Sequence, residues 1–497
     1  MSTPRTYGHW RRPQAPGIGR LSGALTVGVF ALLILMVLVQ IIAGIIPALV
    51  LGSICGSLGL LFARKDMHGV SLAGKIGERM RFWRSRSRGE NLYRSGPLGV
   101  TGGPFMLPGI LAPTRVADFV DGFGRDFAVI TTGKTGTFAV VFACESEGAS
   151  LVTQDQIDTW VARWGQFLAR LGEEPGLIGA SVVVESAPDT GSRLQREITA
   201  NKQENIPNLA EQMLSEVSQL YPYGSASLRA YVTLTFENHL GKGSGKTLDL
   251  AAAGQELATR LPSLSQALTG TGAGFVRPLD AAGVGRVVRL AYDPDAQEIF
   301  DDALASSEAV TLEWNEVGPS ATQANWDNLI HDNAVSVSWV MSAAPRGIVQ
   351  SNILASLLAP SPRIARKRVA LLYRPIEAGR AGEIVEKDKN AASVRVSSSA
   401  NVRARDEVAL AHAVASAAEE AAGAGLENFG MVITATTMRD AGDVKDMADA
   451  VGSLASSARI RIRKCYGGQD SAFAISLPLG VIPGRYSVIS ESVREAL

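Results

Sequence analysis

LSGALTVGVFALLILMVLVQIIAGIIPALVLGSICGSLGLLFA, residues 21–63, is the stretch that decides how this chain is organised. It contains no Asp, Glu, Lys, Arg or His. A helix that crosses a bilayer needs roughly 20 apolar residues, so the stretch is long enough for two crossings and a tight turn. Gly44 and Pro47 disfavour helix continuation and are the expected place for that turn. The sequence therefore predicts a transmembrane helical hairpin over 21–63.

Charge is distributed unevenly around this hairpin. The chain has 48 basic and 48 acidic residues in total, but residues 1–20 carry four arginines and no acid. Residues 64–94 carry nine basic and three acidic residues, whereas 95–497 carry 35 basic and 45 acidic ones. Basic flanks favour the cytoplasmic side of a membrane. We therefore expect a multi-pass protein of the plasma membrane with both termini, including a basic tail over 1–20, in the cytoplasm. The three cysteines are widely spaced, which agrees with a reducing compartment and indicates neither a disulfide framework nor a zinc site.

A basic segment follows the hairpin and passes into a Gly/Pro-rich linker, together spanning 64–115. Basic side chains are attracted to anionic lipid by about 1 kcal/mol each, and aromatic side chains favour the membrane interface. Arginines among aromatics also suit nucleic acid, but the position beside a predicted membrane span favours lipid. The residues expected at the membrane surface are Arg79, Arg81, Arg84, Arg86 and Arg88, with the aromatics Phe82 and Trp83 among them.

Beyond residue 115 the pattern predicts two α/β modules, over 116–310 and 311–497. In the first, 127–130 and 137–143 form a β-hairpin, and Thr153 with Gln156 begins a helix whose apolar positions recur to Leu171. In the second, strands are expected at 335–341, 369–373, 430–436 and 458–463, with helices at 405–422 and 443–455. The polar stretch 313–333 connects the modules. The predicted fold class is α+β, with mostly antiparallel sheets carrying packed helices.

One loop has the composition of a nucleotide-binding site. It consists of Gly243, Ser244, Gly245, Lys246 and Thr247, between a predicted strand and a predicted helix. A phosphate-binding loop needs a glycine where this chain has Leu240, and a second strand that ends in a metal-binding carboxylate. A solvated turn is therefore the favoured interpretation, and nucleotide hydrolysis is the alternative. The five histidines have no ligand spacing with each other or with the cysteines, so no catalytic residue, cofactor or metal is expected.

Several stretches resemble a known family. They are 263–268, 285–294, 327–341 (DNLIHDNAVSVSWVM), 371–375 (LLYRP), 463–473 (RKCYGGQDSAF) and 476–480 (SLPLG). Together they resemble a family of actinobacterial integral membrane proteins that is similar to the N-terminal, non-ATPase part of type IV secretion and conjugation ATPases. The apolar hairpin resembles the small PrgI-like two-helix membrane protein of Gram-positive conjugation systems.

The resemblance implies a division of labour between chains. In the family the ATP-hydrolysing motor follows the N-terminal domain, whereas this chain stops at Leu497, shortly after the Leu477–Gly480 stretch where a motor would begin. The implied function is a non-catalytic, membrane-anchored scaffold of a type IV-like secretion or conjugation apparatus. Its partners would be the lipid bilayer, a separate conjugation-type ATPase, other subunits of the apparatus and further copies of itself. An EccE-like component of type VII secretion, which also has a membrane hairpin before a cytoplasmic domain, is a further alternative.

Overall fold

The computed structural model gives the arrangement of most of the chain. The residues that it describes are 6–8, 10, 23–63, 66–96, 99, 104–133, 135–146, 148, 152–189, 191–201, 206–224, 226–237, 250–305, 310–345, 347–398, 402–440 and 443–486. The protein is a mixed α+β structure built on one large antiparallel sheet, which confirms the predicted class.

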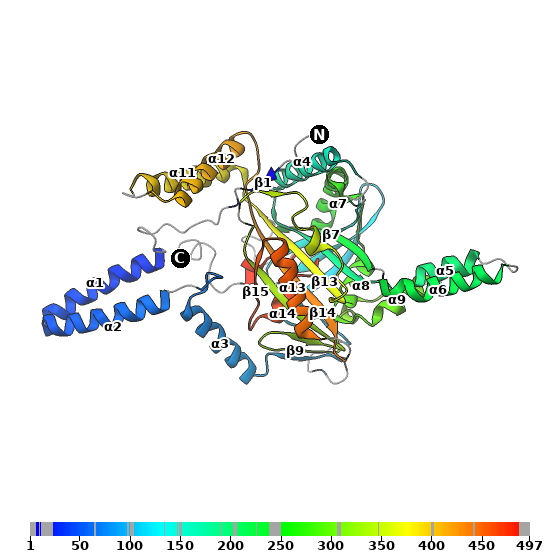
Figure 1. Cartoon of the computed structure of the whole chain (residues 1–497), viewed down its shortest axis with the longest axis horizontal. Coiled ribbons are helices and arrows are strands. Elements are labelled where there is room, and N and C mark those ends of the chain that lie inside the picture. Colours follow the sequence, from blue (N-terminus) through cyan, green and yellow to red (C-terminus); the bar gives the residue numbers. More distant parts are fainter. Residues whose placement is uncertain are drawn as a thin grey trace.

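The apolar stretch forms a helical hairpin that projects from one end of the molecule (Figure 1). Helix α1 spans Gly23–Ala43 and α2 spans Ile45–Ala63. Gly44 alone makes the turn, with a φ of 89° that glycine adopts without strain. Pro47 lies in the first turn of α2, where its missing N–H is not needed, so the expected role of Pro47 in the turn is wrong. Counting only residues whose side chains the structure describes, none of the helices is both long and apolar enough to cross a membrane.

The sheet has thirteen strands, and eleven of them follow one another in the order β2-β9-β10-β11-β14-β13-β6-β7-β5-β4-β3. Strand β15 pairs with β11, and β8 pairs with β5. A separate two-stranded pairing joins β1 (Thr6–Tyr7) to β12 (Val349–Gln350). Every pairing between these strands is antiparallel. The expected separate sheets of two modules are thus one sheet, which is continuous through the pairing of β6 with β13.

The two halves of this sheet have their strands in the same order when these are counted outward from β6 in the first half and from β13 in the second. The first half contains β3 (Thr114–Val120), β4 (Asp126–Thr132), β5 (Thr137–Glu145), α4 (Gln154–Leu171), β6 (Leu177–Pro188), α5 (Ser192–Asn201), α6 (Asn208–Gly224), β7 (Ala226–Glu237), α7 (Leu250–Leu268) and β8 (Phe275–Pro278). The second contains β9 (Ala321–Ala324), β10 (Leu329–His331), β11 (Ala334–Ala343), α10 (Ala355–Leu358), β13 (Arg366–Pro375), α11 (Ala378–Ser397), α12 (Ala404–Ala421), β14 (Glu427–Met438), α13 (Val444–Ser457) and β15 (Arg461–Lys464). In each half a pair of helices is inserted between the two innermost strands.

Five further elements belong to the body. Helices α8 (Ala281–Tyr292) and α9 (Ala296–Ala305) follow the first half, and α14 (Gln469–Ile475) follows the second. Helix α3 (Leu72–Ser87) and the edge strand β2 (Leu92–Arg94) come before the first half. Residues 285–292 belong to α8, and Asp293 is the C-cap of this helix. The predicted connection 313–333 contains β9 and β10, two short strands that lie between β2 and β11 in the sheet.

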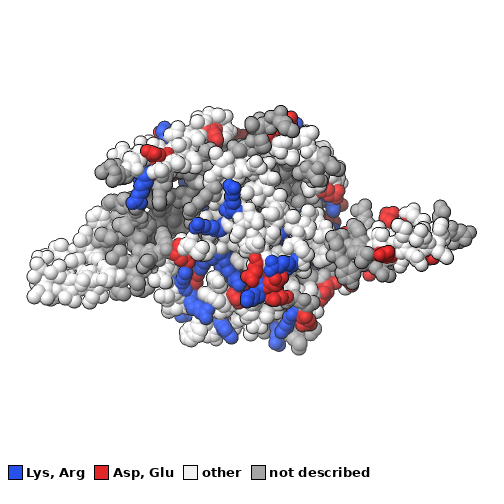
Figure 2. Space-filling view, viewed as in Figure 1, with Lys and Arg blue, Asp and Glu red and all other residues white. Residues whose placement is uncertain are grey.

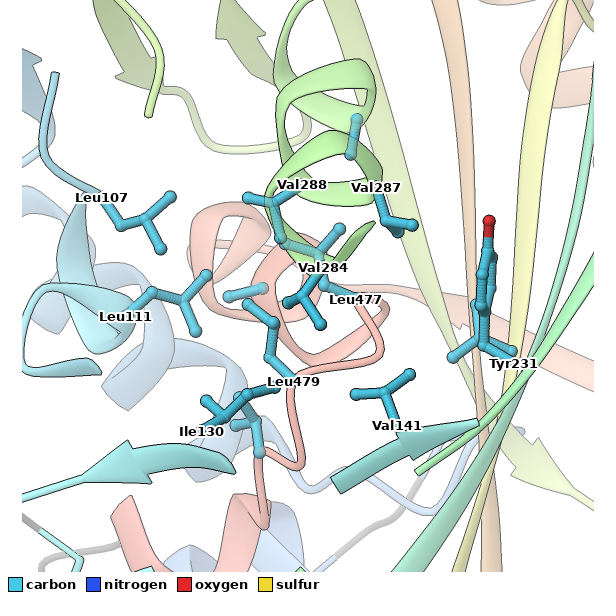
Figure 3. Close-up of a cluster of buried hydrophobic side chains, with 14 of the residues drawn as sticks. Leu107, Leu111, Ile130, Val141, Tyr231, Val284, Val287, Val288, Leu477 and Leu479 are labelled. Carbon is cyan, nitrogen blue, oxygen red and sulfur yellow. The ribbon is translucent and has the colours of Figure 1, made fainter. Parts of the chain in front are cut away.

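Helices cover both faces of the sheet and make separate cores with it. Helices α4 and α7 pack on β4, β5 and β7, and α13 packs on β11, β13 and β14. The opposite face carries the largest core, in which α8, α14 and the segment around Leu477 meet strand residues (Figure 3). Side chains such as Val284 and Val288 of α8 point toward Ile130 and Leu479 there. Each fully buried aliphatic side chain contributes about 1.5–3 kcal/mol, so these cores hold the body together.

Candidate membrane-surface site

Helix α3 starts at a well-defined cap next to the apolar hairpin. The Ser71 hydroxyl accepts a hydrogen bond from the Gly74 N–H at 3.1 Å, which satisfies one free donor of the first turn. Just before it, Asp66 accepts hydrogen bonds from the backbone of His68 and Val70 and pairs with Lys75 at 2.8 Å. The hydrogen bond from Lys75 and those from the backbone hold the pKa of Asp66 far below its usual range. The chain therefore enters α3 in a fixed direction.

The inward face of α3 is attached to the second half of the body. The Glu78 carboxylate accepts two hydrogen bonds from the Arg463 guanidinium of β15, at 2.5 and 3.3 Å. Phe82 meets Trp326 edge to face with ring centroids 5.3 Å apart, and the Arg79 guanidinium lies 4.5 Å from the centroid of the same indole. A bidentate pair shielded from water is stronger than an exposed single contact. Helix α3 is therefore a fixed part of the body.

The outward face of α3 carries an apolar stripe. Leu72, Ile76, Met80 and Trp83 follow one another at intervals of four, four and three residues, which places them on one side of a helix. All four are exposed, Met80 to 66% and Trp83 to 72%. A contiguous exposed apolar surface of this kind marks a site of contact with a membrane or a protein.

Arginines expected at the membrane surface border this stripe on both sides. At 100° per residue, Arg79 and Arg86 lie along one edge of the stripe and Arg84 along the other, while Arg88 and Arg81 lie farther round the helix. All five are exposed, and Arg88 at the helix C-terminus also pairs with Glu90 at 3.5 Å. In Figure 2, Lys and Arg side chains gather where Figure 1 places α3, while the projecting hairpin shows no charge on this face.

Sequence reasoning found the basic residues of this site but missed its apolar stripe. Phe82 was expected at the interface beside Trp83, yet it faces the body, because neighbouring residues of a helix point 100° apart. The spacing of Leu72, Ile76 and Met80 was the available signal. It was hidden because the segment was interpreted as a juxtamembrane linker and not as a helix. The partner of Glu78 lies 385 residues away, and no local pattern indicates it.

The other predicted site cannot be placed. The Gly243–Thr247 loop lies outside the described residues. Among the described residues, no three His, Cys, Asp or Glu side chains gather in a way that could hold a metal ion. A cavity of about 50 Å³ lies beside β2 and α14, lined by residues that include Tyr93, Tyr292 and Asp470. It has room for a few water molecules at most.

A row of polar side chains crosses the middle of the sheet. Its members lie opposite one another in register on five adjacent strands: Ser338, Thr434, Arg368, Glu185 and Arg229. The first four are buried. Arg366 of β13 donates to Glu185 of β6 at 2.7 Å, an ion pair that joins the two halves of the molecule. We call this set, with Arg366, the central polar row.

The charges of the central polar row are unevenly compensated. Burial favours a raised pKa for Glu185, but the charges of Arg366 and Arg368 outweigh it and hold that pKa below the usual value. Burial lowers the pKa of Arg368 to about 10, so its guanidinium stays charged at neutral pH. The guanidinium lies 4.6 Å from the ring centroid of Phe473, and none of its three nitrogens meets a hydrogen-bond acceptor among the described residues. The row is a structural junction with an excess of positive charge.

A buried histidine extends this polar region at β10. The His331 Nδ1 lies 2.5 Å from the Tyr292 carbonyl oxygen, and its Nε2 lies 2.7 Å from the Ser336 hydroxyl. Because a carbonyl can only accept, Nδ1 carries the proton and Nε2 accepts from Ser336. Burial lowers the pKa of His331 to about 4. The neutral ring therefore satisfies two buried polar groups and is a packing residue.

No protein-family model matches the chain, and no curated protein matches it either.

Proposed function

We propose that this protein is a non-catalytic, membrane-anchored scaffold of a type IV-like secretion or conjugation apparatus. The observation that carries the anchor is the surface of α3, an apolar stripe with arginines along both edges. It lies directly after an uncharged helical hairpin and is attached to the body through Glu78 and Arg463. Such a helix suits the boundary between headgroups and acyl chains, where apolar residues insert and cations meet anionic lipid.

The hairpin α1–α2 supplies the second part of the anchor. Its outward surface is apolar, and Ile41 and Ile42 near its end are 76% and 82% exposed. Exposure of these side chains to water is unfavourable by about 25 cal/mol per Å² of apolar surface, relative to burial. Lipid removes that cost, and the basic flanks place both ends of the chain on the cytoplasmic side of the plasma membrane.

The body would then present its far end to cytoplasmic partners. Figure 1 places α5–α6 at the end of the long axis opposite the hairpin. The proposed partner is a separate conjugation-type ATPase, and other subunits and further copies of this chain would complete the apparatus. What supports this part is the resemblance of 263–480 to the non-motor domain of such ATPases. A type VII-like apparatus with an EccE-like arrangement would use the same anchor.

Membrane insertion of the full chain tests the anchor. Leu35→Arg with Leu38→Arg places two cations in the exposed surface of α1, at a cost of about 2.5–3.5 kcal/mol each at a membrane centre. We expect the wild type to stay with vesicles after carbonate extraction and the double variant to be released. Phe275→Arg is the control, because Phe275 is also apolar and exposed but lies on β8 of the body. Release of the wild type, or equal release of all three proteins, would contradict the anchor.

The scaffold role has a separate test. The purified full chain in nanodiscs should bind a conjugation-type ATPase encoded beside it and should itself hydrolyse no ATP. Hydrolysis that disappears in Lys246→Ala would support the nucleotide-hydrolase alternative instead.

A further inference from the structure

The two helix pairs inserted in the halves of the sheet leave the body in opposite directions. Helices α5–α6 connect β6 to β7, and α11–α12 connect β13 to β14. Because β6 and β13 are antiparallel neighbours, with Lys367 opposite Ser186, the end of β6 lies near the start of β13. The two pairs therefore start from opposite ends of the central strands. Figure 1 shows α11–α12 extending toward the same end of the long axis as the α1–α2 hairpin, and α5–α6 toward the other end.

The tip of the α11–α12 pair is both basic and apolar. From Lys389 to Val408 the chain has four basic residues and two acids, Asp406 and Glu407. Val394, Val402 and Val408 around this tip are exposed, Val394 to 61%, and Arg403 is exposed beside Val402. Exposed valines gain free energy when a partner or a membrane covers them, and basic side chains among them are attracted to an anionic surface.

The opposite helix pair has a different character. Helix α6 and the residues just before it carry Glu204, Glu211 and Glu216. Its exposed apolar residues, such as Met213, therefore lie among acids. Anionic lipid would repel this surface. Within one chain, residues 389–408 around the tip on the hairpin side carry four basic and two acidic residues, whereas residues 192–224 of the far pair carry three basic and four acidic ones.

We propose that the tip of α11–α12, formed by Val394, Val402, Arg403 and Val408, is a second contact with anionic lipid headgroups. The inference rests on the proposed anchor, because the hairpin sets which end of the molecule meets the bilayer. Contact at both α3 and this tip fixes the tilt of the body relative to the membrane, which contact at α3 alone does not. The tip thereby holds the far end of the molecule in a constant position for its partners.

Depth-dependent quenching in vesicles tests the contact in the full chain. An environment-sensitive fluorophore is attached at one of three positions: the native Cys55 in α2, Val402→Cys or Met213→Cys. Cys465 is replaced by serine in all three proteins, and Cys55 is replaced by serine in the last two. Cys144 is kept because it is buried. The vesicles contain anionic lipid and nitroxide-labelled lipid. We expect strong quenching at positions 55 and 402 and little at 213. Adding Arg403→Glu should lower occupancy of the lipid contact at 402 by roughly fivefold or more, since each charge contributes about 1 kcal/mol.

The three positions separate the inference from the anchor on which it rests. Quenching at 55 without quenching at 402 beyond that at 213 would leave the anchor standing and overturn the tip contact. Lack of quenching at 55 would overturn both. Quenching at 402 that Arg403→Glu and high salt leave unchanged would overturn the anionic-lipid contact. Shielding of 402 that depends on protein density and not on nitroxide lipid would assign the tip to a neighbouring copy of the chain.

Discussion

Arg368 and Glu185 lie opposite each other at the centre of the sheet, yet they contribute differently to stability. Glu185 is neutralised by Arg366, and its removal would leave two buried guanidinium groups without a counter-charge. Arg368 has a ring beneath it but no hydrogen-bond acceptor among the described residues, so only the nearby charge of Glu185 offsets the desolvation cost of its burial. The row therefore contains one residue whose loss is costly and one whose loss is tolerated.

Paired substitutions should separate these two roles. Glu185→Gln is expected to lower the free energy of unfolding by about 3–5 kcal/mol, the usual cost of breaking a buried pair. Arg368→Met keeps the length of the side chain and its contact with Phe473. It should be neutral or raise the free energy of unfolding by about 1–4 kcal/mol, as replacement of buried charges by apolar residues often does. Urea unfolding of both variants in detergent is the measurement, and equal destabilisation would contradict the assignment.

At the scale of single elements, the helices and strands that could be predicted are those whose position depends on the local sequence pattern. The cap at Thr153 and the apolar period after it locate α4, and Thr153 does accept the Gln156 N–H at 3.4 Å. The alternating residues of β4, β5, β11 and β14 locate those strands. By contrast, β9 and β10 have only four and three residues, which is too short for an alternating pattern to show, and they are held by their neighbours in the sheet. The apolar residues Val284, Val287, Val288 and Ala291 of α8 recur at helical spacing, so this helix could be located from the sequence.

The same distinction applies to the candidate site. Its arginines and Trp83 could be predicted because charge and position beside the hairpin are local properties. Its attachment could not, because Glu78 meets Arg463 and Phe82 meets Trp326 only after the sheet has formed.

Attachment of α3 can be tested through one charge. Glu78→Gln removes the carboxylate that holds Arg463, and a half-buried donor left with a weaker partner costs about 1–3 kcal/mol. Amide exchange over 72–87 should become roughly tenfold faster, while exchange in β4 and β5 is unchanged. Glu90→Gln is the matched control, since Glu90 pairs with Arg88 in solvent at 3.5 Å and such pairs contribute little. If both variants exchange alike, the helix is held by something other than this pair.

At the scale of the whole molecule, the repeated order of elements invites the view of two independent domains, but the pairing of β6 with β13 argues against it. Seven residue pairs join these strands, and Arg366 and Glu185 cross the same junction. The core on the α8 face also contains residues of both halves, such as Val141 and Val432. Separation would expose that core and leave two long strand edges unpaired. A body of this kind can transmit the position of its membrane end to its far end without a hinge.

A single cooperative unfolding transition is therefore expected for the body. Fluorophores attached at an exposed residue of each half, Phe275→Cys on β8 and Val340→Cys on β11, should report the same midpoint in urea, because neither half keeps its core alone. Glu185→Gln should lower both midpoints together. Substitution in the core of one half, such as Val451→Ala of α13, should do the same, at a cost of about 1–3 kcal/mol. If Val451→Ala moves only the midpoint reported at position 340, the halves unfold separately, and the rigid coupling of the two ends fails with them.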